Sequence, residues 1–461
     1  MQTWKSIQFL KSSEKQIYVF ACVLVLLFGG FVRFAYIESI PPTTVTRADA
    51  EKYDNLAHNI LYHGSYSSNK ERPWKQNTYI TPGYPLFLAG VLSTAENENS
   101  FYASTFSIQA VFGALVVLLV FIIGKKFLPY WGAFLASFLT AISPQLVVSN
   151  GYVLTESLFT FFFLLSVFLL FLALKHKNVF LFLLFGLVAG YASLIRPVLL
   201  LFPVVIVLLP FLNTLTGPVG VRLRTGALVT VGILVLWVPW LAFKAQVEHT
   251  NASMRSPLLE SFVLGTYPNL TFRTALYRGY PYLEDPDYKK MQNGFGAALE
   301  ILGERAREKP YAYLRWYFLG KPVTYWQWGN IAGAGGPFIY PVKNSIYSTN
   351  APAVNSLLFS ETSHPLWLIS ALFIVITRIP GLFRGQANSE AEYVIYVLIA
   401  ALAYFTAVHS VLAPLPRYSY PALPLLYLVA VYGIWRLAIG YKGISESVYN
   451  RLRIKIRSVT G

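Results

Sequence analysis

The sequence predicts an all-α polytopic membrane protein with about ten transmembrane helices and two large external loops that carry interfacial helices. Of its 461 residues, 55% are hydrophobic and only 13% are charged. Its mean hydropathy of +0.50 is too high for an ordinary soluble domain. Apolar runs of the ~20 residues that cross a bilayer recur along the chain. The first run, near residues 17–37, has no convincing small-residue cleavage site, which indicates an uncleaved span.

Charge and cysteine content exclude two other interpretations. The formal net charge of +16 would suggest nucleic-acid binding in a soluble chain. Here the basic residues gather in short turns between apolar runs, where they orient a membrane protein, so no nucleic-acid partner is expected. The single cysteine, Cys22, lies within the first apolar run, so an intrachain disulfide is not expected.

The basic residues predict the orientation of the chain. Lys5, Lys11 and Lys15 precede the first span, which places the N-terminus in the cytoplasm. Bases also occupy each expected short cytoplasmic turn and a C-terminal tail at 451–457. The ten expected spans lie near residues 17–37, 101–123, 131–148, 155–175, 180–195, 198–212, 227–243, 366–378, 393–413 and 418–437.

These spans divide the chain into three expected regions. They are a transmembrane catalytic region at 1–243 that includes an external first loop at 38–100, an external loop with interfacial helices at 244–364, and C-terminal transmembrane helices with a basic cytoplasmic tail at 365–461. Residues 297–328 mix charged and aromatic side chains, as in a helix that lies in the membrane interface. The sequence leaves open whether this stretch contains an additional buried helix.

The first external loop carries a candidate catalytic helix. Thr46 followed three residues later by Asp49 is typical of a helix N-terminus. Asp49, Lys52 and Tyr53 then recur at helical spacing on one face. Asp49 either favours the helix start through the helix dipole or acts as a general base toward an acceptor. Lys52 and Tyr53 either bind a sugar or phosphate, or are an ordinary solvated lysine and its neighbour.

Three more ionisable residues lie at the outer ends of spans, on the side of the membrane expected for Asp49. Charges at such positions are costly unless they are paired or hydrated, so a functional site is the default interpretation. Glu156 either pairs with an arginine, positions Asp49 or contacts the sugar. Arg196 and Arg417 either bind lipid headgroups or hold a donor phosphate and stabilise its charge as it departs.

Several motifs resemble one family in the same order. The sequence resembles the bacterial membrane glycosyltransferases related to protein O-mannosyltransferases and aminoarabinose transferases, which are glycosyltransferase family 39-like. The motifs are DAEKY at 49–53, TPGYPLFLAG at 81–90, TES at 155–157, LIRP at 194–197 and PRYSYPALP at 416–424. Two positions depart from the family pattern, because Ala50 replaces a second acid and Thr81–Gly83 replaces a lysine-proline-proline phrase.

The resemblance implies a GT-C-type fold, a catalytic external first loop and a polyprenyl-phosphate sugar as donor. It places Asp49 at the family's catalytic acid and Lys52 and Tyr53 at the basic and aromatic positions that follow. Tyr84 and Tyr418 lie within the shared motifs and complete the set of substrate-binding candidates with Lys52, Tyr53, Arg196 and Arg417.

Together these observations predict a polyprenyl-phosphate-sugar-dependent hexosyl- or pentosyltransferase in the plasma or inner membrane. Its active site is expected on the external or periplasmic side, with a lipid, glycan or protein as acceptor and membrane lipids as further partners. Asp49 is expected to act as general base with inversion, and Glu156 is the second catalytic candidate. No metal ligands are predicted, because the histidines lack ligand spacing, and a divalent cation is left open.

Two alternatives remain at this stage. A transporter or flippase of a lipid-linked sugar also needs apolar grooves and phosphate-binding arginines, but its polar groups are expected at mid-membrane depth rather than at one face. A non-catalytic membrane scaffold would leave the four charges at the outer ends of the spans unexplained.

Overall fold

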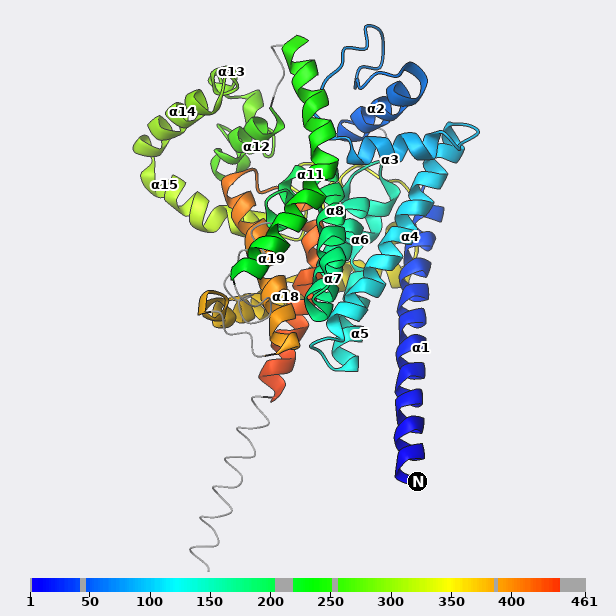
Figure 1. The fold of residues 1–461 in the computed structure, drawn as a ribbon. Coiled ribbons are helices and arrows are strands. Elements are labelled where there is room, and N and C mark those ends of the chain that lie inside the picture. The colour runs from blue at the N-terminus through cyan, green and yellow to red at the C-terminus, as the bar shows by residue number, and fades with distance from the viewer. Residues whose placement is uncertain (1, 42–46, 204–218, 251–255, 385–388, 440–461) are drawn as a thin grey trace, which may run out of the picture.

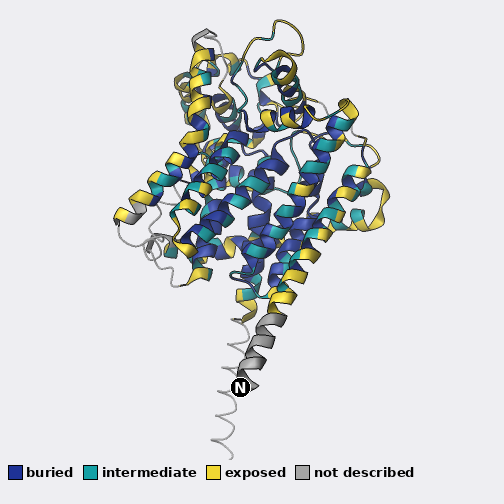
Figure 2. Ribbon diagram, turned by 45° about the vertical axis from the view of Figure 1, so that its right-hand side comes forward, coloured by how far each residue is buried: buried dark blue, intermediate teal, exposed yellow. Residues whose placement is uncertain are grey.

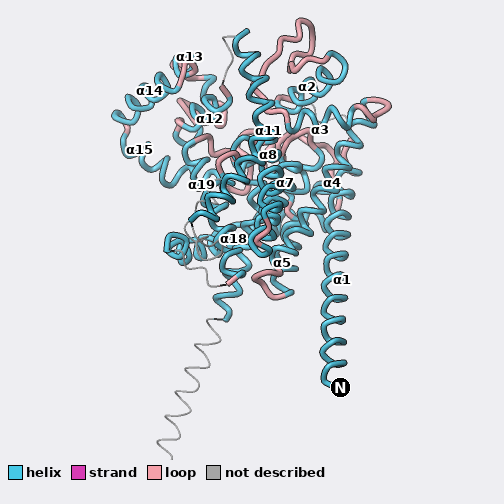
Figure 3. The backbone as a smooth tube through the Cα atoms, viewed as in Figure 1, coloured by secondary structure: helices cyan, strands magenta, loops and turns pink. Residues whose placement is uncertain are grey.

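The structure is a computed structural model that describes residues 2–41, 47–203, 219–250, 256–384 and 389–439. Over these residues the chain forms helices joined by loops (Figures 1 and 3), with one isolated bridge between Gly335 and Phe338. Seven of the described helices are long and apolar enough to cross a membrane, and eight if one bent pair counts as a single span. The predicted all-α membrane fold is therefore confirmed.

Most of the candidate spans lie in the lower part of the molecule as drawn in Figure 1. The helices of this bundle are α1 (Gln2–Glu38), α4 (Glu98–Gly124), the bent pair α5 (Tyr130–Ile142) and α6 (Pro144–Val148), α7 (Glu156–His176), α8 (Val179–Ile195), α11 (Val219–Thr250), α18 (Ala351–Arg384) and α19 (Glu390–Val411), followed by a last candidate span at Pro416–Ile439. Figure 2 shows buried residues concentrated in the middle of this bundle.

Eight of the ten expected spans correspond to these long helices or to the bent pair. The fifth corresponds to α8, which at 17 residues is shorter than the others. The sixth, at 198–212, lies mostly outside the described residues, as does the basic tail at 451–457.

The eighth span differs from the expected range of 366–378. The observed α18 has 34 residues and continues through Pro365 and Pro380. Proline removes a helix hydrogen bond, but membrane helices tolerate proline where neighbouring groups satisfy the backbone. As a result α18 begins at Ala351, inside the segment that was expected to form the second external loop.

Glycines allow α8 and α11 to pack closely. A Cβ atom on Gly186 of α8 would lie 2.4 Å from the carbonyl oxygen of Val229, and one on Gly232 of α11 would lie 2.7 Å from that of Leu183. Close backbone contacts of this kind are common between membrane helices. Lipid tails are as apolar as the helix surfaces, so close van der Waals packing, rather than the hydrophobic effect, drives the helices together.

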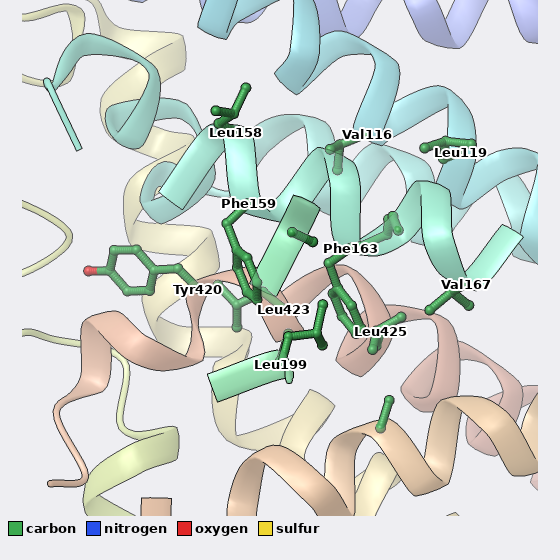
Figure 4. Close-up of a cluster of buried hydrophobic side chains, with 14 of the residues drawn as sticks. Val116, Leu119, Leu158, Phe159, Phe163, Val167, Leu199, Tyr420, Leu423 and Leu425 are labelled. Carbon is green, nitrogen blue, oxygen red and sulfur yellow. The ribbon is translucent and has the colours of Figure 1, made fainter. Parts of the chain in front are cut away.

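Apolar packing places the last span against the start of α7. Figure 4 shows Phe159 and Phe163 of α7 beside Leu423 and Leu425 of the last span. Phe159, Phe163 and Leu425 are fully buried. This cluster fixes the 3-10 turn η7 (Pro416–Ala422) near the N-terminus of α7. The turn carries Arg417, and α7 begins with Glu156, so the packing brings two predicted site residues into one region.

The shorter helices lie at the end of the bundle away from the N-terminus of α1 (Figure 1). The first loop supplies α2 (Asp49–His63) and α3 (Gly83–Leu92), and the later segment supplies α12 (Pro257–Gly265), α13 (Tyr288–Met291), α14 (Phe295–Glu308) and α15 (Pro310–Arg315). The chain then returns to the bundle through the π-turn η6 (Trp316–Gly320) and α16 (Lys321–Trp326).

The stretch at 297–328 consists of short helices, and none of them is among the candidate spans. On α14, Ala298 and Ile301 are buried, whereas Leu299 is exposed. Tyr311 and Phe318 are also exposed, at 77% and 73%. Exposed apolar side chains opposite a buried face are typical of a helix at the membrane interface.

We predict that Gly186→Ala lowers the thermal unfolding temperature of the protein in detergent by several degrees. The added Cβ meets a backbone oxygen at 2.4 Å, so α8 and α11 must separate, and overpacking of this kind costs roughly 1 to 3 kcal/mol. Gly90→Ala on α3 is the matched control, because its Cβ has nothing within 4 Å. Equal unfolding temperatures for the two variants would contradict this account of the α8 and α11 contact.

Candidate active site

The candidate site begins at Asp49, the first residue of α2. The expected N-cap, Thr46, lies outside the described residues, and the residue before the helix, Ala48, makes no side-chain cap hydrogen bond. Asp49 and Glu51 both lie in the first turn, where carboxylates favour the helix dipole. The helix dipole therefore explains an acidic residue at this position, but it does not explain which residue the carboxylate pairs with.

That partner is Arg417. Nη2 of Arg417 donates a hydrogen bond of 2.8 Å to Oδ2 of Asp49, across 368 positions of the sequence. Nζ of Lys52 lies 3.9 Å from the other oxygen, Oδ1. The Asp49 side chain nevertheless remains 40% exposed, against 19% for Arg417. One face of the carboxylate is thus fixed by a charge-assisted hydrogen bond while the group stays accessible.

A second ion pair joins α7 to the end of α8. Arg196 donates from Nη2 to Oε1 of Glu156 and from Nε to Oγ1 of Thr155, the latter at 2.7 Å. The Glu156 side chain is only 2% exposed, and that of Arg196 is 15% exposed. Of the roles considered for Glu156, the structure shows a pair with Arg196.

Tyr418 brings the two pairs together. The guanidinium carbons of Arg196 and Arg417 lie 5.8 and 5.3 Å from the centre of its ring, within cation–π range. His409 stacks on the same ring at 5.2 Å, and Tyr325 stacks on His409 at 4.8 Å. The arginines of the two ion pairs therefore meet at one aromatic ring.

The remaining candidates lie beside Asp49 on α2 and α3. Tyr53 meets the ring of Tyr84 edge to face at 5.1 Å. Tyr84 is fully buried, and its hydroxyl donates to Oε1 of Gln109 at 2.9 Å. Tyr84 therefore supports Tyr53 from within the protein, whereas Lys52 is 48% exposed at the surface of the site.

Two residues that the sequence analysis did not select extend the site. Nζ of Lys52 lies 5.5 Å from the centre of the Tyr79 ring, and the Tyr79 hydroxyl donates to Oε2 of Glu260 at 2.6 Å. Glu260 belongs to α12, so this contact brings the later external segment to the first loop. No spacing signal connects two residues 181 positions apart, because the contact depends on how α12 packs.

The electrostatic surroundings keep Asp49 ionised near neutral pH. Burial raises the pKa of the Asp49 carboxyl, but the charge and hydrogen bond of Arg417, with further attraction from Lys52 and Arg196, lower it more. The net effect is a pKa below the ordinary value of 3.8. The carboxylate is therefore available as an acceptor of hydrogen bonds or protons.

A separate ionisable group occupies another part of α2. Nδ1 of His58 lies 3.7 Å from Oδ1 of Asp54, and Nε2 of His58 lies 2.8 Å from Oε1 of Glu98. Burial is the main reason that the pKa of Asp54 rises to about 6. Within the described part of the chain, no group of three or more His, Cys, Asp or Glu residues is arranged to hold a metal ion.

We predict that the Asp49 and Arg417 pair makes stability depend on pH. Because the pKa of Asp49 is lower in the folded protein than 3.8, the carboxylate stabilises the fold above that pH. This contribution is lost as pH falls through the lower folded pKa. The unfolding temperature of wild type should exceed that of Asp49→Asn at pH 7, and the difference should vanish toward pH ~2. A difference that persists unchanged in an Arg417→Gln background would contradict the pairing.

Comparison with known families gives a match within the transmembrane region. Residues 81–243 match the family described as dolichyl-phosphate-mannose-protein mannosyltransferase. This segment contains Tyr84, Glu156 and Arg196, and it ends before Arg417. No curated protein sequence matches the chain.

Solved structures with a similar arrangement of helices share little sequence with this chain. The apo oligosaccharyltransferase from Archaeoglobus fulgidus aligns with a TM-score of 0.50 and 14% identity, over 93% of this chain and 52% of that one. The archaeal oligosaccharyltransferase AglB from the same organism, in complex with an inhibitory peptide and a dolichol-phosphate, aligns with a TM-score of 0.49 and 15% identity, over 94% of this chain and 52% of that one. ArnT from Cupriavidus metallidurans bound to undecaprenyl phosphate aligns with a TM-score of 0.49 and 14% identity, over 94% of this chain and 63% of that one.

This chain thus spans about half the length of the oligosaccharyltransferases and under two thirds of ArnT. The likeness to the apo oligosaccharyltransferase extends over nearly all of the present chain and concerns the fold. Residues 81–243 therefore resemble the dolichyl-phosphate-mannose-protein mannosyltransferase family, and the fold of the chain resembles that of the apo oligosaccharyltransferase.

Proposed function

We propose that this protein transfers a sugar from a polyprenyl-phosphate donor to an acceptor on the external or periplasmic face of the membrane. The observation that carries the proposal is the accessible Asp49 carboxylate beside two guanidinium groups that share the Tyr418 ring. A base next to an anion-binding pair is what this transfer requires, because a hydroxyl or amine must lose a proton while a lipid phosphate leaves. The family match supports the class of donor.

In this mechanism Asp49 is the general base. Arg417 fixes Oδ2 of the carboxylate, and the exposed side chain takes the proton of the acceptor as the acceptor's oxygen or nitrogen bonds to the anomeric carbon. The bond from that carbon to the phosphate oxygen breaks at the same time, and the phosphate leaves with the electron pair. Attack from the face opposite the phosphate inverts the anomeric configuration.

The arginines would hold the donor phosphate. A guanidinium has five N–H donors, and the bonds from Arg196 to Glu156 and Thr155 use two of them. The buried Glu156 would therefore act through Arg196 by holding its orientation. Lys52 and Tyr53 lie beside Asp49 in a position to bind the sugar or its phosphate.

The site lies at the end of the bundle that carries α2, α3 and α12 to α15 (Figure 1). The positive-inside rule places the N-terminus of α1, at the other end, in the cytoplasm. The reaction would then occur on the outer side of a plasma or inner membrane, and the polyprenyl chain would reach the site from the surrounding lipid.

We predict that Asp49→Asn lowers the rate of sugar transfer by about 10²- to 10⁴-fold, the range typical of a general base. The measurement is transfer from a polyprenyl-phosphate sugar by purified protein in proteoliposomes, with carrier translocation followed in the same vesicles. Asp54→Asn is the matched control, since it removes a carboxylate from the same helix that faces His58 instead of Arg417.

Two outcomes would contradict this assignment. Near-normal transfer by Asp49→Asn would remove Asp49 as the base. Carrier translocation by wild type without any sugar transfer would instead favour a flippase.

We also predict that Arg196→Lys lowers kcat/KM for the donor by about 10-fold or more, because lysine keeps the charge but loses the planar fork that binds phosphate. Steady-state kinetics at varied donor concentration give the effect. Arg378→Lys is the control, because Arg378 pairs with Glu392, 3.6 Å away, outside the site. Unchanged donor kinetics in Arg196→Lys would identify Arg196 as a structural residue.

A further inference from the structure

A small cavity lies inside the bundle next to Glu156. It is enclosed by α1, α4, α7 and the turn η1 (Ser149–Gly151), and it leaves about 10 Å³ for the centre of a water-sized sphere. This is room for about one water molecule. The lining residues used below are Arg33, Gly113, Asn150, Glu156 and Ser157.

Arg33 is a buried cation in the first span, with 1% of its surface exposed. Nη1 donates to the carbonyl oxygens of Gly29 at 3.0 Å and Ala141 at 3.4 Å, and Nη2 donates to that of Thr140 at 3.4 Å. Thr140 and Ala141 lie at the end of α5, where the chain bends and Pro144 has no N–H to continue the helix. Two of the three guanidinium nitrogens therefore satisfy backbone carbonyls.

The third nitrogen has a different environment. Nε of Arg33 is buried and has no hydrogen-bond partner, and no carboxylate among the described residues lies within ion-pair distance of Arg33. An unpaired buried donor costs free energy, and a charged one costs more. A hydrogen-bond acceptor for Nε of Arg33 is therefore expected among the polar groups around it.

Three other polar atoms of the cavity lining also lack a hydrogen-bond partner. Oδ1 of Asn150, Oε2 of Glu156 and Oγ of Ser157 are buried without a hydrogen-bond partner, and all three residues line the same cavity as Arg33. Each side chain belongs to a residue at least nine-tenths buried. One N–H donor, two acceptor oxygens and a hydroxyl thus belong to residues that line one cavity, and a buried water molecule uses partners of this kind.

We propose that a water molecule binds in this cavity and links Nε of Arg33 to Oε2 of Glu156. The water accepts a hydrogen bond from Arg33 and donates to Glu156 and Asn150. Glu156 then lies between two guanidiniums, bonded directly to Arg196 through Oε1 and through the water to Arg33. Arg33 is then a positioning residue for the Glu156 and Arg196 pair. An effect of Arg33 on the rate of sugar transfer rests on the proposed function.

Gly113 of α4 provides the space for this water site. A Cβ atom on Gly113 would lie 2.3 Å from Nε of Arg33 and 2.6 Å from Oδ1 of Asn150. Gly113→Ala therefore alters the cavity without removing any of its polar side chains. Gly30→Ala on α1 is the matched control, because its Cβ has ordinary contact with Ala114 at 3.8 Å.

The first test is a high-resolution structure of the full chain. Wild type and Gly30→Ala should show water density within hydrogen-bond distance of Nε of Arg33 and Oε2 of Glu156, and Gly113→Ala should not. An empty cavity in wild type, or a direct contact between Arg33 and Glu156, would overturn the proposal.

The second test follows the hydrogen bonding of the Glu156 carboxylate by infrared spectroscopy, with Glu156→Gln used to assign its bands. Wild type and Gly30→Ala should show the same carboxylate stretching frequency, whereas Gly113→Ala and Arg33→Gln should shift it, because Oε2 loses the hydrogen bond from the water. Gly113→Ala keeps Arg33 as a donor, so it remains informative if Arg33→Gln fails to fold. Unchanged bands in Gly113→Ala would overturn the link between Arg33 and Glu156.

Kinetics give a third readout. If the water link positions Arg196, Gly113→Ala should lower kcat/KM for the donor by about 10-fold, since small displacements at a site have effects of this order or larger. Gly30→Ala should leave it unchanged. A wild-type protein without transfer activity would refute the proposed function but not the water site, because the density and infrared tests require no substrate.

Discussion

The hydrogen-bonded ion pair between Asp49 and Arg417 joins the first external loop to the last membrane span. Charged groups at the edge of a bilayer are costly unless they are paired or hydrated. The loop and the span each supply the opposite charge that pairs with the charge of the other. Arg417 lies in a 3-10 turn with prolines at 416 and 421, which restrict the backbone that carries it. The site therefore forms only when α2 docks on the end of the bundle, and its geometry depends on the fold as a whole.

The second ion pair, Glu156 with Arg196, also joins distant segments of the chain, and it is more buried than the first. Arg196 directly follows the last residue of α8 and precedes Pro197, so its position depends on where that helix stops. Glu156 begins α7, and both guanidiniums then contact the Tyr418 ring. Three cations and two carboxylates form the ion pairs of the site, which favours an anionic ligand such as a phosphate.

Hydropathy and the position of charges predicted the all-α membrane fold and the gathering of Asp49, Glu156, Arg196 and Arg417. The pattern of pairing was not predictable, because either arginine could have paired with Glu156 and only tertiary packing selects Arg196. The contact from Tyr79 to Glu260 had no signal for the same reason. Arg33 also escaped notice, since one base in an apolar run does not change the prediction of a span. The start of α18 at Ala351 was not predicted either, because the helix continues through Pro365 into the segment expected to be an external loop.

The charged side chains differ in exposure, and under the proposed function this difference separates residues that contact substrate from residues that support them. Asp49 is 40% exposed, Arg196 15% and Glu156 2%. Arg33 is as buried as Glu156 and lines the cavity on its inner side. An exposed carboxylate can exchange a proton with an acceptor, whereas a buried one can only orient its neighbours. Because Glu156 fixes Arg196 and Asp49 fixes Arg417, both arginines are held in place before any ligand arrives. Under the proposed function, preorganised charge of this kind needs no rearrangement when a phosphate begins to leave.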